Sequence, residues 1–213
     1  MGEEDDDYEQ TSDEINREDG LTLFLQDRPR FKLYSAGRHL YNLKSLEQKY
    51  NSIVAAEARI QTEIEIDCFL AEIIEAVAAL LAQINEKLDL GLDINETDFE
   101  TVQSGLSSKT KKIDLLSDID AARQYGNWYW QLEELKNYSL HGSLLSKSIT
   151  TTIPSNLSSF DHLSQIYFKK DPHNPDLSLP MDLEIVPYLQ LCLGKAEELI
   201  ERIRSKEPML RPE

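Results

Sequence analysis

The sequence predicts a mainly α-helical protein: a helical bundle with one very long helix or helical arm at about residues 38–90, and a possible minor β element near 21–34 and 148–153. Glycine and proline number only eight each among 213 residues, which is few for a protein built from strands and tight turns. Neither occurs between Gly37 and Gly91. Within that segment the apolar residues recur three and four positions apart, which is the helical period.

The first twenty residues are strongly acidic. They hold ten acids against one base, Arg17, and so carry −9 of the chain's net charge of −17. A segment this polar buries too little apolar surface to offset its ordering entropy, so we expect 1–20 to be an acidic disordered tail. The next stretch, 21–34, alternates apolar and polar residues around Pro29, which predicts extended segments or a ragged hairpin.

The segment 38–90 contains two apolar stripes that do not share one helical register. A step near residues 62–67 therefore leaves two alternatives open, one continuous helix or two shorter ones. A continuous helix of about 50 residues would be roughly 75 Å long at 1.5 Å per residue, too long to bury itself. We therefore expect a protruding coiled-coil-like arm whose seam binds a partner. The seam residues are Leu43, Leu46, Tyr50, Ile53, Ile60 and Ile64.

Shorter elements follow Gly91. The expected boundaries between these helices lie at Gly105, Gly126 and Gly142. We place residues 21–206 in a single mostly α-helical domain and expect 207–213 to be a frayed C-terminus. The expected helices are 97–105, 107–126, 127–142, 159–170 and 187–204, with the strand 148–153 between the third and fourth.

The sequence "NWYW" gathers both tryptophans at 127–130. In a helix, Trp128 shares a stripe with Tyr125, Leu132, Leu135 and Tyr138, which predicts a core position for Trp128. Trp130 lies about 200° away, on the polar side. Tryptophan is enriched at interaction hot spots, so Trp130 is a candidate contact residue, although coverage by another segment of the chain is the favoured alternative.

No pattern of catalytic or metal-binding residues is evident. Cys68 and Cys192 lie in apolar surroundings typical of inert thiols, and His39, His141, His162 and His173 are isolated. The stretch Asp89 to Glu100 resembles a calcium loop in its first, fifth and twelfth positions, but Ile94 stands where the EF-hand needs glycine. We therefore predict no enzyme activity, no cofactor and no metal site.

Composition also limits location and partners. The sequence contains no run of about 18 apolar residues, so no membrane span is predicted. Its acidic start is unlike that of a signal peptide. Two unpaired cysteines suit a reducing compartment, so we expect an intracellular protein of cytoplasm or nucleus. Direct nucleic-acid binding is not expected, because basic clusters are small.

These observations favour a non-catalytic helical protein–protein interaction subunit, an adaptor or scaffold in a hetero-complex or homo-oligomer. One alternative is an acidic antagonist, such as an antitoxin- or immunity-like inhibitor that occupies a basic site. A second is an all-α enzyme with an unrecognised site.

Overall fold

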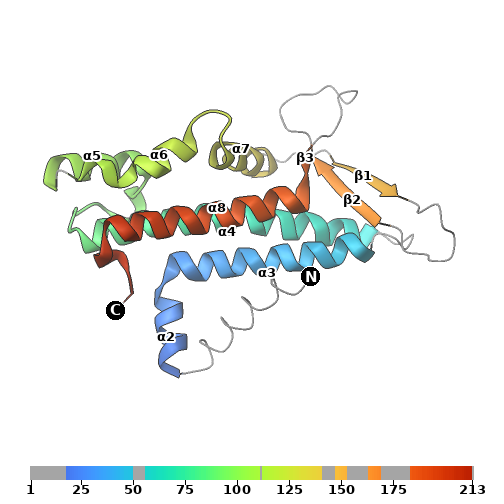
Figure 1. The fold of residues 1–213 in the computed structure, drawn as a ribbon, viewed down its shortest axis with the longest axis horizontal. Coiled ribbons are helices and arrows are strands. Elements are labelled where there is room, and N and C mark those ends of the chain that lie inside the picture. The colour runs from blue at the N-terminus through green and yellow to red at the C-terminus, as the bar shows by residue number, and fades with distance from the viewer. Residues whose placement is uncertain are drawn as a thin grey trace.

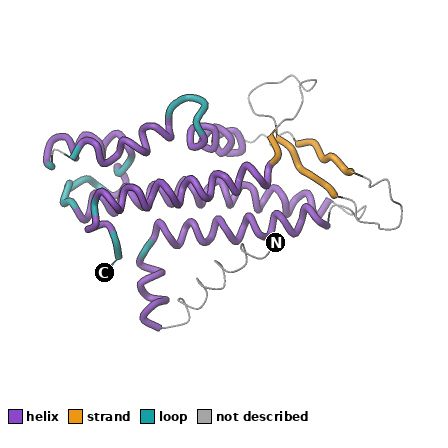
Figure 2. The backbone as a smooth tube through the Cα atoms, viewed as in Figure 1, coloured by secondary structure: helices purple, strands orange, loops and turns teal. Residues whose placement is uncertain are grey.

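The computed structural model describes residues 18–49, 56–110, 112–140, 147–152, 163–168 and 183–212. Helices dominate these residues (Figures 1 and 2), so the predicted mainly α fold is confirmed. The helices are α2 (Glu18–Gln26), α3 (Arg28–Lys49), α4 (Ala56–Lys87), α5 (Phe99–Lys109), α6 (Ser117–Arg123), α7 (Trp128–Leu140) and α8 (Ile185–Lys206), with 3-10 turns η1 (Ile94–Glu96), η2 (Ile113–Leu116) and η3 (Pro208–Leu210). The strands β1 (Lys147–Thr152), β2 (Leu163–Phe168) and β3 (Leu183–Glu184) form an antiparallel sheet in the order β1-β2-β3.

Three long helices, α3, α4 and α8, lie side by side and form the body of the protein (Figure 1). The chain reverses between α3 and α4, since Lys32 pairs with Glu72 while His39 pairs with Glu65. The shorter helices α5, α6 and α7 form a second layer against α4 and α8, and the small sheet sits at one end of the long helices, opposite α2 (Figure 1).

The expectation of one long helix or protruding arm at 38–90 is wrong. Helix α3 ends at Lys49, α4 begins at Ala56, and the two pack along each other. The alternative break near 62–67 is also wrong, because α4 runs through that segment without interruption. Each helix presents an apolar stripe, and packing one stripe on the other removes both from water within a single chain.

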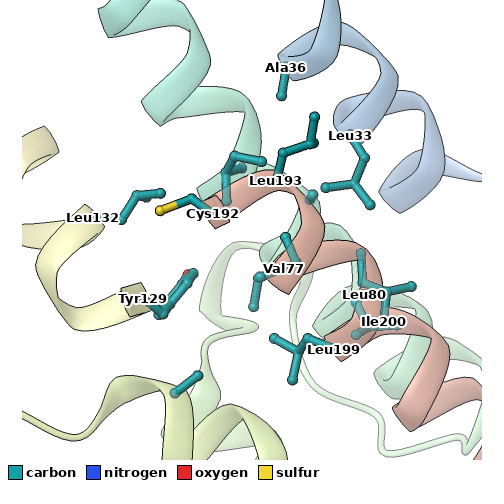
Figure 3. Close-up of a cluster of buried hydrophobic side chains, with 14 of the residues drawn as sticks. Leu33, Ala36, Val77, Leu80, Tyr129, Leu132, Cys192, Leu193, Leu199 and Ile200 are labelled. Atoms are coloured by element: carbon teal, nitrogen blue, oxygen red, sulfur yellow. The ribbon is translucent and has the colours of Figure 1, made fainter. Parts of the chain in front are cut away.

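One part of the hydrophobic core lies where four helices meet (Figure 3). Figure 3 shows side chains of α3, α4, α7 and α8 converging on one another. The labelled members of this part are Leu33 and Ala36 from α3, Val77 and Leu80 from α4, Tyr129 and Leu132 from α7, and Cys192, Leu193, Leu199 and Ile200 from α8.

The predicted β element at 21–34 is wrong, since these residues form α2 and the start of α3. Asp27 separates the two helices, and its carboxylate accepts a hydrogen bond from the backbone N–H of Arg30 at 3.3 Å. Pro29 falls in the first turn of α3, where its missing N–H leaves no helical hydrogen bond unmade. The alternation of apolar residues reflects two short faces around Asp27 and not a strand.

The predicted strand near 148–153 is confirmed as β1, but its partner is β2 and not 21–34. The helix expected at 159–170 is wrong, because Leu163–Phe168 is β2. Gly105 does not end its helix: α5 continues to Lys109, and a side chain at Gly105 would meet Leu90 at 3.3 Å.

The two chain ends also differ from expectation. Residues 1–17 of the expected acidic tail lie outside the described residues, and Glu18 already begins α2. The expected frayed C-terminus, 207–213, contains η3, and Leu210 is buried against the core. Leu210 and the buried Glu207, which pairs with Lys112, thus hold this end to the bundle.

Candidate functional site

The predicted seam divides between the core and the surface. Leu43 is fully enclosed, with 0% of its surface exposed, and Leu46 is half-buried. Tyr50 and Ile53 lie outside the described residues. Ile60 and Ile64, by contrast, keep 61% and 46% of their surface in solvent. The seam as a whole is therefore not offered to a partner, and the expectation for Leu43 is corrected: it is a core residue.

Helix geometry explains why Ile60 and Ile64 are left outside. The side of α4 that packs on α3 in this region carries Thr62, Glu65 and Phe69, all of which are buried. Ile60 and Ile64 lie one turn apart on the opposite side of the helix. Asp67, the next residue on that outer stripe, accepts a hydrogen bond from the Ser139 hydroxyl of α7 at 2.5 Å. Ile60 and Ile64 therefore lie closer to the start of α4 than the point where α7 contacts it.

A polar cluster fixes α3 against α4 behind these isoleucines. The Glu65 carboxylate accepts hydrogen bonds from His39 Nδ1 and Gln61 Nε2, both at 2.7 Å, and from Asn42 Nδ2 at 3.3 Å. Burial opposes ionisation of Glu65, but these hydrogen bonds outweigh it, so the pKa of Glu65 lies below its ordinary value. An ionised carboxylate only accepts, so His39 carries its hydrogen on Nδ1.

A second polar contact lies two turns further along. Lys32 of α3 forms an ion pair with Glu75 and a second with Glu72, the latter at 3.1 Å. The hydrogen bond to Glu75, opposed by burial and supported by Glu72, raises the pKa of Lys32. These contacts fix the rotation of α4 about its own axis relative to α3. They therefore also fix the direction in which Ile60 and Ile64 face.

The aromatic cluster differs from the predicted stripe. Tyr129 is the buried member, Trp128 packs against the core while half-buried, and Tyr125 is exposed. Trp130 is half-buried, and its ring lies 4.5 Å from that of Tyr125. Trp130 therefore has an aromatic neighbour from its own chain. Its role in partner contact stays a prediction.

Neither cysteine has the surroundings of a nucleophile. Burial raises the pKa of Cys192 to about 12. Burial, and then the charges of Glu65, Asp67 and Glu72, raises the pKa of Cys68 as well. Both effects disfavour the thiolate, which is the reactive form.

Two aspartates of the acidic loop 89–100 accept hydrogen bonds from the nearby backbone. Asp93 accepts from the N–H of Asn95 at 2.8 Å, and Asp98 forms a capping box with Thr101 at the start of α5. Among the residues that the structure describes, no group of three or more His, Cys, Asp or Glu side chains could hold a metal ion. His141, His162 and His173 lie outside those residues.

Sequence reasoning missed the buried ion pair between Asp27 and Arg204. The two guanidinium nitrogens Nη1 and Nη2 lie 3.0 Å and 2.5 Å from the Asp27 carboxylate, and both side chains are almost wholly buried. The pair joins the α2–α3 corner to the end of α8, 177 residues away in sequence. No local pattern indicates such a partner, since each residue looks like an ordinary surface charge.

The chain matches no family model, no curated protein and no solved structure. Within the described ranges, no helix combines the length and apolar character needed to cross a membrane.

Proposed function

We propose that this chain is a non-catalytic helical interaction subunit that binds a partner helix through Ile60 and Ile64 of α4. The observation that carries the proposal is the exposure of two isoleucines one turn apart, on a helix whose rotation is fixed by Lys32 and Glu65. Isoleucine is among the residues most often buried, and an exposed pair on a rigid element is a typical anchor for a partner helix.

The energy available from this pair is useful but limited. Full burial of an isoleucine side chain contributes about 1.5–3 kcal/mol, so burying the exposed parts of Ile60 and Ile64 contributes roughly 2–3 kcal/mol together. That corresponds to a change in Kd of about 30- to 150-fold. A complete interface needs further contacts, and Trp130 stays a second candidate for them.

The competing proposal, an acidic antagonist, has less support. An antagonist needs carboxylates gathered on one face and available to a basic partner. In the described residues, many carboxylates are engaged with bases of the chain itself. Such pairs include Asp27–Arg204, Glu65–His39, Glu72–Lys32, Glu100–Arg123, Asp118–Lys206 and Glu207–Lys112.

The test is affinity purification of the full chain from its source cells, with retained proteins quantified by mass spectrometry. The test variant is Ile60→Asp with Ile64→Asp. The matched control is Ile94→Asp, since Ile94 is 77% exposed in η1 and receives the same substitution. Circular dichroism melting of each variant checks that the fold is retained.

We expect at least one stoichiometric partner that wild type and Ile94→Asp retain and the double variant loses. Two results would contradict the proposal: wild type retains no partner, or the folded double variant retains every partner at the wild-type level.

A further inference from the structure

The two exposed isoleucines of α4 have a carboxylate at each end. Glu57 lies three positions before Ile60, and Asp67 lies three positions after Ile64. Residues at these spacings share one side of a helix, so the four side chains form a single stripe about 15 Å long. All four are exposed. We call Glu57, Ile60, Ile64 and Asp67 the acid-flanked stripe.

Both flanking carboxylates keep their charge for a partner. Glu57 is exposed in the first turn of α4. Ser139 donates its hydroxyl hydrogen to Oδ1 of Asp67, and because a hydroxyl is neutral, the negative charge of Asp67 stays in place. Two other carboxylates of α4, those of Glu65 and Glu72, are instead engaged with side chains of α3.

Acids outnumber bases throughout the first three turns of α4. Residues 56–67 contain four acids and one base, Arg59. At 3.6 residues per turn, position 59 lies about 100° around the helix from Ile60 and about 140° from Ile64, and so on a different side. Glu63 already has an interaction within the chain and does not belong to the stripe. The charges that α4 places in line with the two isoleucines are therefore negative.

We propose that the acid-flanked stripe binds a basic amphipathic helix of a different protein. This inference rests on the proposed function and adds the chemistry of the partner. Such a helix carries two apolar residues one turn apart, which cover Ile60 and Ile64. A lysine or arginine one turn beyond each apolar residue then meets Glu57 at one end and Asp67 at the other. Apolar contact supplies affinity, and the flanking charges select the partner and fix its register.

Charge also argues against a second copy of this chain as the occupant. A two-fold symmetric pair brings the same surface of both copies together. With the helices antiparallel, Glu57 of each copy faces Asp67 of the other. With the helices parallel, Glu57 faces Glu57 and Asp67 faces Asp67. Like charges therefore meet at both ends of the stripe in either orientation, and such contacts suppress the pairing.

The experiment uses the full chain and, as probe, the purified protein that wild type retains and Ile60→Asp/Ile64→Asp loses. Isothermal titration calorimetry measures its Kd at low and high NaCl concentration. The test variant is Glu57→Lys with Asp67→Lys. The matched control is Glu86→Lys with Asp120→Lys, since both are exposed acids outside the stripe. Glu57→Lys alone leaves the hydrogen bond between Asp67 and Ser139 intact, so it serves as the test if the double variant does not fold. Static light scattering gives the mass of each chain on its own.

We expect the double charge reversal to raise Kd about ten-fold or more, because two attractions become repulsions, and Glu57→Lys alone to raise it about three-fold. The control reversal should change Kd by less than about two-fold, and salt should weaken binding of the wild type.

Equal Kd values for the test and control reversals would overturn the basic partner and leave the proposed function standing, because binding would still depend on Ile60 and Ile64. Tighter binding by the test reversal would show that the partner is acidic. A wild-type dimer that Ile60→Asp/Ile64→Asp converts to a monomer would show that a second copy is the occupant. If wild type retains no partner at all, the proposed function and this inference both fail.

Discussion

Removing one partner of the Asp27–Arg204 pair should destabilise the protein severely. With Asp27 changed to alanine, the Arg204 guanidinium, 4% exposed, would keep the 3.4 Å contact to Gln83 Oε1 and a 3.8 Å ion pair with the exposed Glu201. Its Nε already lacks a hydrogen-bond partner in the described structure. With Arg204 changed to alanine, the Asp27 carboxylate, 2% exposed, would keep only the backbone N–H of Arg30.

The expected magnitude follows from leaving a buried charge uncompensated. Single substitutions of this kind reduce the free energy of unfolding by about 3–5 kcal/mol. For a chain of about 200 residues, each kcal/mol lowers Tm by about 2–4 °C, so the loss is roughly 6–20 °C. The double variant Asp27→Ala/Arg204→Ala should lose less than the sum of the two single variants, because no unpaired charge is left.

Urea unfolding followed by circular dichroism measures all four proteins of this cycle. The control is Arg202→Ala, an exposed arginine two residues away that pairs with exposed Glu198, and it should change stability by less than 1 kcal/mol. The reasoning is refuted if Arg204→Ala is as mild as Arg202→Ala, or if the two single effects simply add.

Two further predictions concern pH and backbone conformation. The lowered pKa of Glu65 means that its contribution to stability is complete above its unfolded pKa, about 4.3, and is lost as pH falls towards the folded value. Glu65→Gln should therefore flatten the decline of the urea midpoint below about pH 5, and parallel declines in variant and wild type would contradict this. Gly126 has φ of 81°, so Gly126→Ala should destabilise by about 1–2 kcal/mol, although nothing lies within 4 Å of the added carbon. The same change at Gly194, inside α8 and equally uncrowded, should stabilise by about 0.5–1 kcal/mol, and equal signs at the two glycines in thermal melts would contradict the conformational argument.

Local signals predicted those parts of the fold that local interactions form. The final helix was expected at 187–204 and is α8, Ile185–Lys206, because its apolar residues repeat at the helical period over five turns. The helix expected at 97–105 corresponds to α5, Phe99–Lys109, and Asp98 caps its start by accepting a hydrogen bond from the N–H of Thr101. The strand near 148–153 was indicated by β-branched residues alone.

Predictions failed where a residue's role depends on a distant segment. Residues 159–170 carry a helical pattern, yet β2 pairs with β1 and β3, and those partners are not encoded within the segment itself. The same holds for the candidate site. One helical stripe linked Leu43 to Ile64, but the reversal between α3 and α4 buries the first and exposes the second.

The sequence by itself therefore determined that this chain is helical, where most of its helices lie and that its charge is unevenly distributed, since period, capping and composition are local properties. Only the tertiary structure decided which apolar residues remain in solvent and that Asp27 and Arg204 meet. These outcomes arise from packing between segments far apart in the chain. The physical reason is that a helix specifies its own apolar stripe, whereas what covers that stripe depends on every other segment that competes for it.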